Sequence, residues 1–166
     1  EPDTGFLAEG YEGKGRMPEP EKIVEAAQLV VLNNAKELPL KGKKVLITAG
    51  GTKERIDPVR FISNDSSGKM GYSLAKAARD LGAEVKLVTA TNLLPIPFGV
   101  ESIYVQSSEE MESEVLDKFH NLDMVIMAAA VSDYRPKTQA NVKIKKTNED
   151  LTLVLEKTTD ILAELG

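Results

Sequence analysis

The chain has 166 residues, a formal net charge of −5, 42% hydrophobic residues and 28% charged residues. These values are typical of a globular protein with a real core, and the acidic balance argues against a chain that coats nucleic acid. The absence of cysteine excludes disulfides and thiolate chemistry, and a single histidine predicts no metal site of protein ligands. No apolar run is long enough for a membrane helix and no signal peptide opens the chain, so we expect a cytoplasmic protein that binds neither membranes nor nucleic acid.

The first part of the chain, residues 1–39, predicts an arm followed by a helix. Residues 1–20 hold four glycines and three prolines, a composition that favours a loop or arm with little core of its own. Apolar residues at helical spacing predict a helix over 21–38. The boundary is expected near Pro39–Lys43, which leaves residues 40–166 as the main domain.

The main domain alternates apolar runs with amphipathic segments. The buried runs predict strands over 44–51, 84–90, 100–106 and 122–131, and helices are predicted over 68–83 and 107–121, the latter capped by Ser107 or Ser108. The apolar face of the first helix is expected at Met70, Leu74, Ala77, Ala78 and Leu81. This β-α-β-β-α-β order predicts an α/β fold, an open and mostly parallel sheet flanked by helices.

The tail of the chain departs from that order. Alternating polar and apolar residues on both sides of "TNED" predict an antiparallel hairpin over 142–157. A further helix is expected to begin near Thr159 or Asp160.

The loop after the first strand is the strongest candidate for a ligand site. Gly50 and Gly51 permit close backbone approach, and Ser66, Ser67 and Gly68 precede a helix whose free N–H groups favour an anion. In open α/β sheets ligands bind beyond the carboxyl ends of the strands, so the loop predicts phosphate binding. The alternative is a capping loop without a ligand, and neither common nucleotide fingerprint is present.

Three other patterns each have a structural alternative. Tyr72 and Lys76 match the Tyr-x-x-x-Lys pair of short-chain dehydrogenases, but two fixed residues on this early helix favour coincidence. Asp133 follows a strand end, where it would bind a ribose or base or simply start a turn. Lys143 and Lys145 on one face of a strand would clamp phosphates or protect a sheet edge from aggregation.

Four blocks in one order closely resemble bacterial phosphopantothenoylcysteine synthetase, usually the C-terminal half of a bifunctional coenzyme A biosynthesis protein. They are "TAGGTKERIDPVRFISNDSSGKMG", "AAAVSDYRP", "KIKK" and "TTDILAELG", and the resemblance covers about residues 40–166. It implies a Rossmann-like ligase domain that joins 4′-phosphopantothenate to cysteine. CTP, accompanied by Mg²⁺, would convert the carboxylate of 4′-phosphopantothenate to an acyl-cytidylate and release pyrophosphate. The amine of cysteine would then attack this intermediate and release CMP. The resemblance also implies a homodimer, and relatives outside the bacterial type can prefer ATP.

The resemblance assigns roles to matching positions. Asn64 would hold the acyl-cytidylate and orient it for cysteine, Arg60 would help clamp it, and Lys143 would stabilise charge during nucleotidyl transfer. The nucleotide site would comprise Gly50, Gly51, Ser66, Ser67 and Gly68 along the phosphates, Ala129 and Asp133 around the cytidine, and Lys143.

The two ends of the chain carry their own expectations. Residues 8–20 resemble the substrate flap of the partner decarboxylase, with Glu9 where that family commonly has a cysteine. FMN is expected only in that decarboxylase half. The synthetase family continues beyond "DILAELG", so we expect a domain shortened at its C-terminus. The alternatives are an NAD(P)-dependent Rossmann-like oxidoreductase and an inactive fragment or assembly module of the bifunctional protein.

Overall fold

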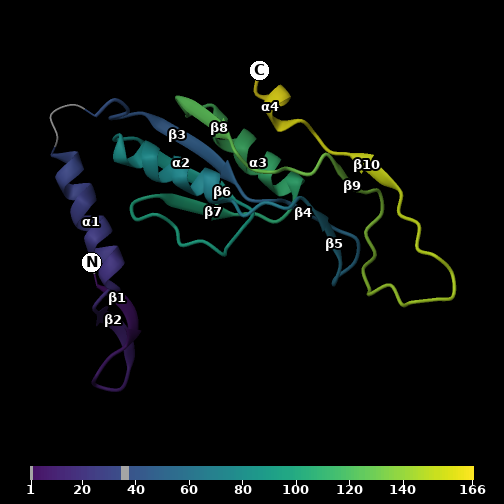
Figure 1. Cartoon of the computed structure of the whole chain (residues 1–166), viewed down its shortest axis with the longest axis horizontal. Helices are drawn as coiled ribbons and strands as arrows, with labels where there is room; N and C mark the ends of the chain where they lie inside the picture. The colour runs from purple at the N-terminus through teal and green to yellow at the C-terminus, as the bar shows by residue number, and fades with distance from the viewer. Residues whose placement is uncertain (1, 35–37) are drawn as a thin grey trace. The chain divides into compact units, whose positions relative to one another are not determined.

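A computed structural model describes residues 2–34 and 38–166 of the chain (Figure 1). The chain divides into two compact units, Glu1–Leu38 and Pro39–Gly166. Positions 35–37 of the helix predicted over 21–38 lie outside the described residues.

The N-terminal unit is a small antiparallel hairpin followed by a helix. Strand β1 (Asp3–Phe6) pairs with β2 (Glu12–Arg16), and α1 spans Pro20–Asn33 with a proline in its first turn. The prediction of a loop over 1–20 is therefore wrong for the strands. Backbone hydrogen bonds between Leu7 and Tyr11 and between Gly10 and Leu7 close the turn, so the glycines serve a hairpin rather than an irregular arm.

The larger unit is built on a four-stranded parallel sheet in the order β7-β6-β3-β8. The strands are β3 (Lys44–Ala49), β6 (Glu84–Thr89), β7 (Glu101–Tyr104) and β8 (Met124–Met127). All three neighbouring pairs are parallel, and the predicted α/β class is confirmed. The central strand β3 contains a continuous apolar run, Val45–Ile47, because helices cover both faces of the sheet.

Side chains that alternate along β3 divide the core into two layers. Val45 and Ile47 pack with α2 (Lys69–Asp80), whereas Leu46 packs with α3 (Ser108–Phe119) and with the short helix α4 (Ile161–Glu164). The predicted cap of α3 is confirmed, since Ser107 Oγ accepts from the Glu110 N–H at 3.1 Å. The Asp160 carboxylate caps α4 in the same way.

The predicted apolar face of α2 is partly wrong. Met70 is 71% exposed and Leu81 is 43% exposed, whereas Tyr72 and Ala75 are buried together with Ala78. The helix turns its small side chains and one aromatic ring toward β3, which brings its backbone close to the sheet.

Two short antiparallel hairpins extend from the carboxyl end of the sheet. The first, β4 (Lys53–Arg55) with β5 (Phe61–Ser63), is absent from the sequence prediction. The second pairs β9 (Tyr134–Pro136) with β10 (Leu155–Lys157) and confirms a C-terminal antiparallel hairpin.

The predicted strand over 142–146 is wrong. These residues belong to the long loop between β9 and β10 and carry no regular structure (Figure 1). The backbone N–H and C=O of Ile144 bind the side chains of Asp57 and Arg60 instead of a neighbouring strand. Lys143 and Lys145 therefore lie on a loop rather than on a sheet edge.

In the part of the chain that the structure describes, no helix is long and apolar enough to cross a membrane.

Candidate functional site

The strand order places a topological switch point between β3 and β8. From β3 the chain runs through α2 to β6 and β7 on one side of the sheet, then through α3 to β8 on the other side. Ligands of open α/β sheets bind in the crevice that such a reversal leaves at the carboxyl ends of the strands. A ligand site is therefore expected at the segments that follow β3 and β8.

These two segments remain paired beyond the regular strands. Gly51 forms a parallel bridge with Ala130, and the Ala130 N–H donates to the Gly50 carbonyl at 2.8 Å. The buried Thr52 hydroxyl accepts from the Ser132 N–H at 2.9 Å. We call the carboxyl ends of β3 and β8, with the segments that follow them, the ligand edge. Its backbone is held in register on both sides of the switch point.

Glycines bring a third segment, residues 63–68, against this pair. A Cβ at position 51 would lie 2.5 Å from the Asn64 carbonyl oxygen, so only glycine permits this approach. Gly68 has φ +76°, and a Cβ there would lie 2.7 Å from the Thr91 side chain. Gly68 is the N-cap residue of α2 and supplies no side-chain cap, while the Ser66 and Ser67 hydroxyls accept from the Gly68 and Lys69 N–H groups at 3.3 and 3.4 Å. The partial positive charge of such a helix end favours an anion.

The side chain of Asn64 links the loop to the segment after β8. Its Nδ2 donates to the Val131 carbonyl at 3.0 Å and lies 3.5 Å from the Ala130 carbonyl. The side chain is exposed, so a ligand at this edge can also reach it. The structure thereby brings Gly50, Gly51, Asn64 and the Ser66–Gly68 turn to one edge, as the sequence predicts for a phosphate site.

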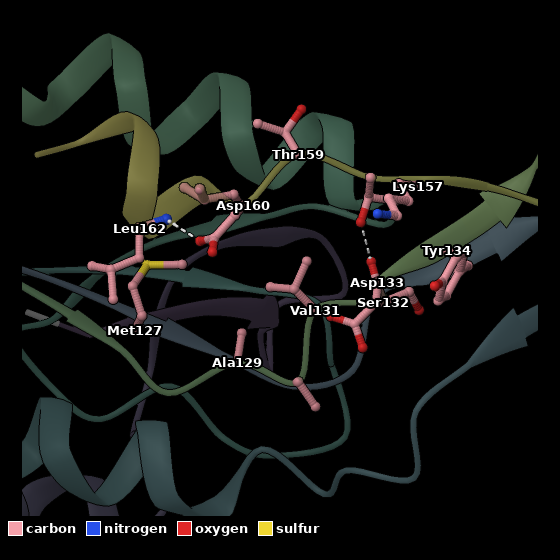
Figure 2. Close-up of a pocket in the computed structure, with 13 residues that line it drawn as sticks. Met127, Ala129, Val131, Ser132, Asp133, Tyr134, Lys157, Thr159, Asp160 and Leu162 are labelled. Carbon is pink, nitrogen blue, oxygen red and sulfur yellow. Dashed lines mark hydrogen bonds between the residues drawn. The ribbon is translucent and has the colours of Figure 1, made fainter.

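A pocket of about 490 Å³ opens at the end of β8 and contains the predicted Ala129 and Asp133. It is lined by residues 127, 129–134 and 157–162, and Figure 2 shows Thr159 and Asp160 across the pocket from Ala129 and Val131. Two hydrogen bonds join its sides: Thr158 donates from its hydroxyl to the Ser132 carbonyl at 2.6 Å and from its N–H to the Asp133 carbonyl at 2.9 Å.

The predicted Arg60 and Lys143 lie outside this pocket, at a turn next to β4 and β5. The Asp57 carboxylate, with a side chain that is 0% exposed, accepts from the N–H groups of Val59, Arg60 and Ile144 at 2.8–3.1 Å. Arg60 pairs with Asp57 at 2.8 Å and donates to the Ile144 carbonyl. Lys143 is exposed beside this junction.

The surroundings of Asp57 favour its charged form. Burial would raise the pKa of this carboxyl, but the three backbone N–H donors and the Arg60 guanidinium outweigh burial and hold the pKa below its ordinary value. A carboxyl whose pKa is lower in the folded protein adds stability that is complete above the unfolded pKa of about 3.9. That contribution is lost as the pH falls through the lower, folded pKa.

We therefore expect the free energy of unfolding to decline below about pH 4, partly through Asp57. The Asp57→Asn variant should show a smaller decline between pH 7 and pH 3 in urea unfolding followed by circular dichroism, because its side chain no longer titrates. Asp150→Asn, which removes an exposed carboxylate, serves as the control. An unchanged slope in Asp57→Asn would contradict the assignment.

Tyr72, the tyrosine of the dehydrogenase-like pair, is a buried structural residue. Its hydroxyl donates to the Thr91 carbonyl at 2.9 Å and accepts from Thr89 Oγ1 at 3.3 Å. These contacts fix α2 to the end of β6 and occupy the hydroxyl that a dehydrogenase would need for proton transfer. This arrangement counts against the oxidoreductase alternative.

Several residues at the site have roles that the sequence analysis did not find. The Thr48 hydroxyl accepts from the N–H groups of Ala128 and Ala129, both at 3.1 Å, and so shapes the end of β8. Ser132 and Thr158 line the pocket, and Asp57 organises the turn. The contacts of Thr48 with residues 128–129, of Thr158 with Ser132 and of Asp57 with Ile144 each join positions more than 25 residues apart, so no local pattern signals them. Throughout residues 2–34 and 38–166, no three carboxylate or imidazole side chains gather as metal ligands would.

A Rossmann-like α/β protein, with its ligand edge at the switch point of a parallel sheet, is the class that this fold and site define. The family described as DNA/pantothenate metabolism flavoprotein C-terminal domain matches residues 40–166, and the chain belongs to this family. The resemblance predicted from the four sequence blocks is thereby confirmed.

Individual relatives agree with this assignment. The Coenzyme A biosynthesis bifunctional protein CoaBC of Bacillus subtilis is 50% identical over 100% of this chain, which spans 41% of that relative's length. A crystal structure of the C-terminal domain of a CoaBC protein is 47% identical with a TM-score of 0.68, and the match covers 78% of this chain and 61% of that domain. A structure of Cab2 with phosphopantothenate-cysteine shares the fold at 20% identity and a TM-score of 0.62, over 89% and 67% of the two chains.

Proposed function

We propose that this chain carries the ligase site that joins 4′-phosphopantothenate to cysteine at the expense of CTP, in coenzyme A biosynthesis. The observation that carries the proposal is the convergence, in a member of this family, of residues 50–52, 63–68 and 129–133 at one switch point. In the first step a carboxylate oxygen of 4′-phosphopantothenate attacks the α-phosphorus of CTP, and pyrophosphate leaves. In the second, the cysteine amine attacks the acyl carbon, loses a proton and displaces CMP.

The amino end of α2 is the proposed seat of the nucleotide phosphates. Gly50 and Gly51 are buried and let neighbouring segments approach closely, and the Ser66–Gly68 turn leads into the amino end of α2, where the N-cap residue is a glycine. Mg²⁺ would arrive with the triphosphate as its counter-ion, since the described residues offer no cluster of protein ligands for it. The cytidine would occupy the neighbouring pocket beside Ala129 and Asp133.

Lys143, Arg60 and Asn64 complete the proposed site. An ammonium group such as that of Lys143 stabilises the charge that builds on phosphate oxygens during nucleotidyl transfer. The Asn64 amide donates hydrogen bonds without adding charge, so it suits an acyl-phosphate intermediate. The Arg60 guanidinium already binds the Asp57 carboxylate and the Ile144 carbonyl. Arg60 would therefore help to hold the intermediate by fixing this turn.

A homodimer and a neighbouring FMN-dependent decarboxylase domain belong to the proposal for the whole protein. Exposed apolar side chains at Val59, Phe61 and Leu155 on the two short hairpins are consistent with a covered face. Light scattering of the purified chain tests the dimer, and a monomeric mass would count against it.

A pyrophosphate-release assay with 4′-phosphopantothenate, cysteine and either CTP or ATP tests the proposal directly. We expect release with CTP, and a fall of roughly tenfold in Lys143→Gln, because the amide cannot neutralise phosphate charge. Lys146→Gln, two residues beyond Ile144 on the same exposed loop, is the matched control. Fluorescence titration with NADPH separates the oxidoreductase alternative, and absence of pyrophosphate release under all conditions would favour the assembly module.

A further inference from the structure

The loop between β9 and β10 is attached to the rest of the domain at a few points, and one of them is the Asp57 turn. Residues 137–154 contain no regular structure apart from the backbone contact between Lys137 and Val154 at their two ends. Within them, the Ala140 N–H donates to the Ile56 carbonyl at 2.9 Å, and both backbone groups of Ile144 bind the turn. Lys143 lies between these attachments.

The two oxygens of Asp57 have separate tasks. Oδ1 accepts from the N–H groups of Val59 and Arg60 at 2.9 and 2.8 Å, and so shapes the turn itself. Oδ2 accepts from the Ile144 N–H at 3.1 Å and pairs with Arg60 at 2.8 Å. One carboxylate thereby joins the turn after β4 to a loop residue 87 positions further along the chain.

We propose that Asp57, with Arg60, is a positioning residue for Lys143: it fixes the backbone of the neighbouring Ile144 to the turn between β4 and β5, and so limits where the lysine can reach. The inference rests on the proposed function, in which Lys143 acts on the nucleotide. The turn leads through β5 directly to Asn64, which in turn binds the Val131 carbonyl at the switch point. Asp57 thus connects the exposed lysine to the segments that form the proposed phosphate site.

Asp57→Asn separates the two tasks of the carboxylate. The two N–H donors at Oδ1 select the amide oxygen for that side, so the amide nitrogen faces the Ile144 N–H and Arg60. The turn keeps its acceptor, whereas the loop loses its acceptor and meets a donor instead. Exchange of the Ile144 amide hydrogen should become about tenfold faster or more, measured by NMR or mass spectrometry.

A double-mutant cycle in the full chain tests whether this attachment matters for Lys143. Asp57→Asn should lower the rate of pyrophosphate release about tenfold, as expected for a misplaced catalytic group. Combining it with Lys143→Gln should cost little more than Lys143→Gln alone, because one variant misplaces the same ammonium that the other removes. Asp150→Asn, on the same loop, should leave exchange and activity unchanged.

Two outcomes would overturn the inference: effects of Asp57→Asn and Lys143→Gln that multiply, or unchanged exchange at Ile144 in Asp57→Asn. If the wild-type chain releases no pyrophosphate, the proposed function fails separately. The exchange of the Ile144 amide then decides alone whether Asp57 holds this loop.

Discussion

Gly71→Ala should lower the melting temperature by roughly 3 to 10 °C, although alanine is the better helix former. A Cβ at position 71 would lie 2.5 Å from the Ala49 Cβ and 2.7 Å from the Thr48 carbonyl oxygen. Carbon atoms in contact are ordinarily about 3.5–4.0 Å apart, so α2 would have to move away from β3 by about 1 Å. Overpacking of this kind costs about 3 kcal/mol where backbone atoms are in the way, and helix propensity returns roughly 1 kcal/mol, which leaves a net loss of about 2 kcal/mol.

Ser73→Ala is the matched control for this substitution. It places the same side chain two residues later on the exposed face of α2, where propensity alone acts and the melting temperature should stay the same or rise slightly. Differential scanning calorimetry of both variants measures the contrast. A Gly71→Ala protein as stable as the wild type would show that the close contact between α2 and β3 is unimportant.

The contact at Gly71 also explains which part of the fold the sequence could predict. Val45, Leu46 and Ile47 form a continuous apolar run in β3 because α2 and α3 cover both faces of the sheet, and this signal is local. The face of α2 depends instead on how closely the helix approaches the sheet. Gly71, Ala75 and Ala78 permit that approach and are buried with the Tyr72 ring, whereas Met70 remains exposed.

The short hairpin β4–β5 shows why other elements escaped prediction. Its first strand consists of Lys53, Glu54 and Arg55, a sequence without any apolar alternation. Tertiary contacts stabilise it: the Phe61 ring lies 5.3 Å from Lys53 Nζ and 5.5 Å from Arg55 Cζ. The buried Glu54 accepts from the Ser108 N–H at 2.9 Å.

The site also contains some residues that a local sequence pattern indicates and others that only the three-dimensional structure identifies. Glycines and serines before a helix are a local signal for an anion, and the structure does bring Gly51 and Gly68 to one edge. The residue pattern around Lys143 predicts a strand, whereas the structure holds that loop through Asp57. A carboxylate in a Asp-Pro sequence resembles an ordinary turn former, and its partner at position 144 can be identified only in three dimensions.

Asn64→Asp should slow amide formation roughly a hundredfold while the release of pyrophosphate in the first turnover continues. The carboxylate would repel the phosphate and acyl oxygens of the intermediate, and it would lose the donor that reaches the Val131 carbonyl at 3.0 Å. In the proposed mechanism, activation of the carboxylate substrate would need Lys143 and the phosphate seat, and the substitution leaves the lysine and this helix end unchanged. The acyl-cytidylate should therefore accumulate and be detectable by rapid quench and chromatography.

The control for this charge change is Asn121→Asp, an exposed asparagine between α3 and β8 at the opposite end of the sheet. It should keep wild-type rates of both steps. If Asn64→Asp turned over normally, the proposed role of Asn64 would be wrong. If pyrophosphate release and amide formation fell together, Asn64 would instead serve to attach the loop to the segment after β8, since a displaced loop would disturb the phosphate seat and the intermediate alike.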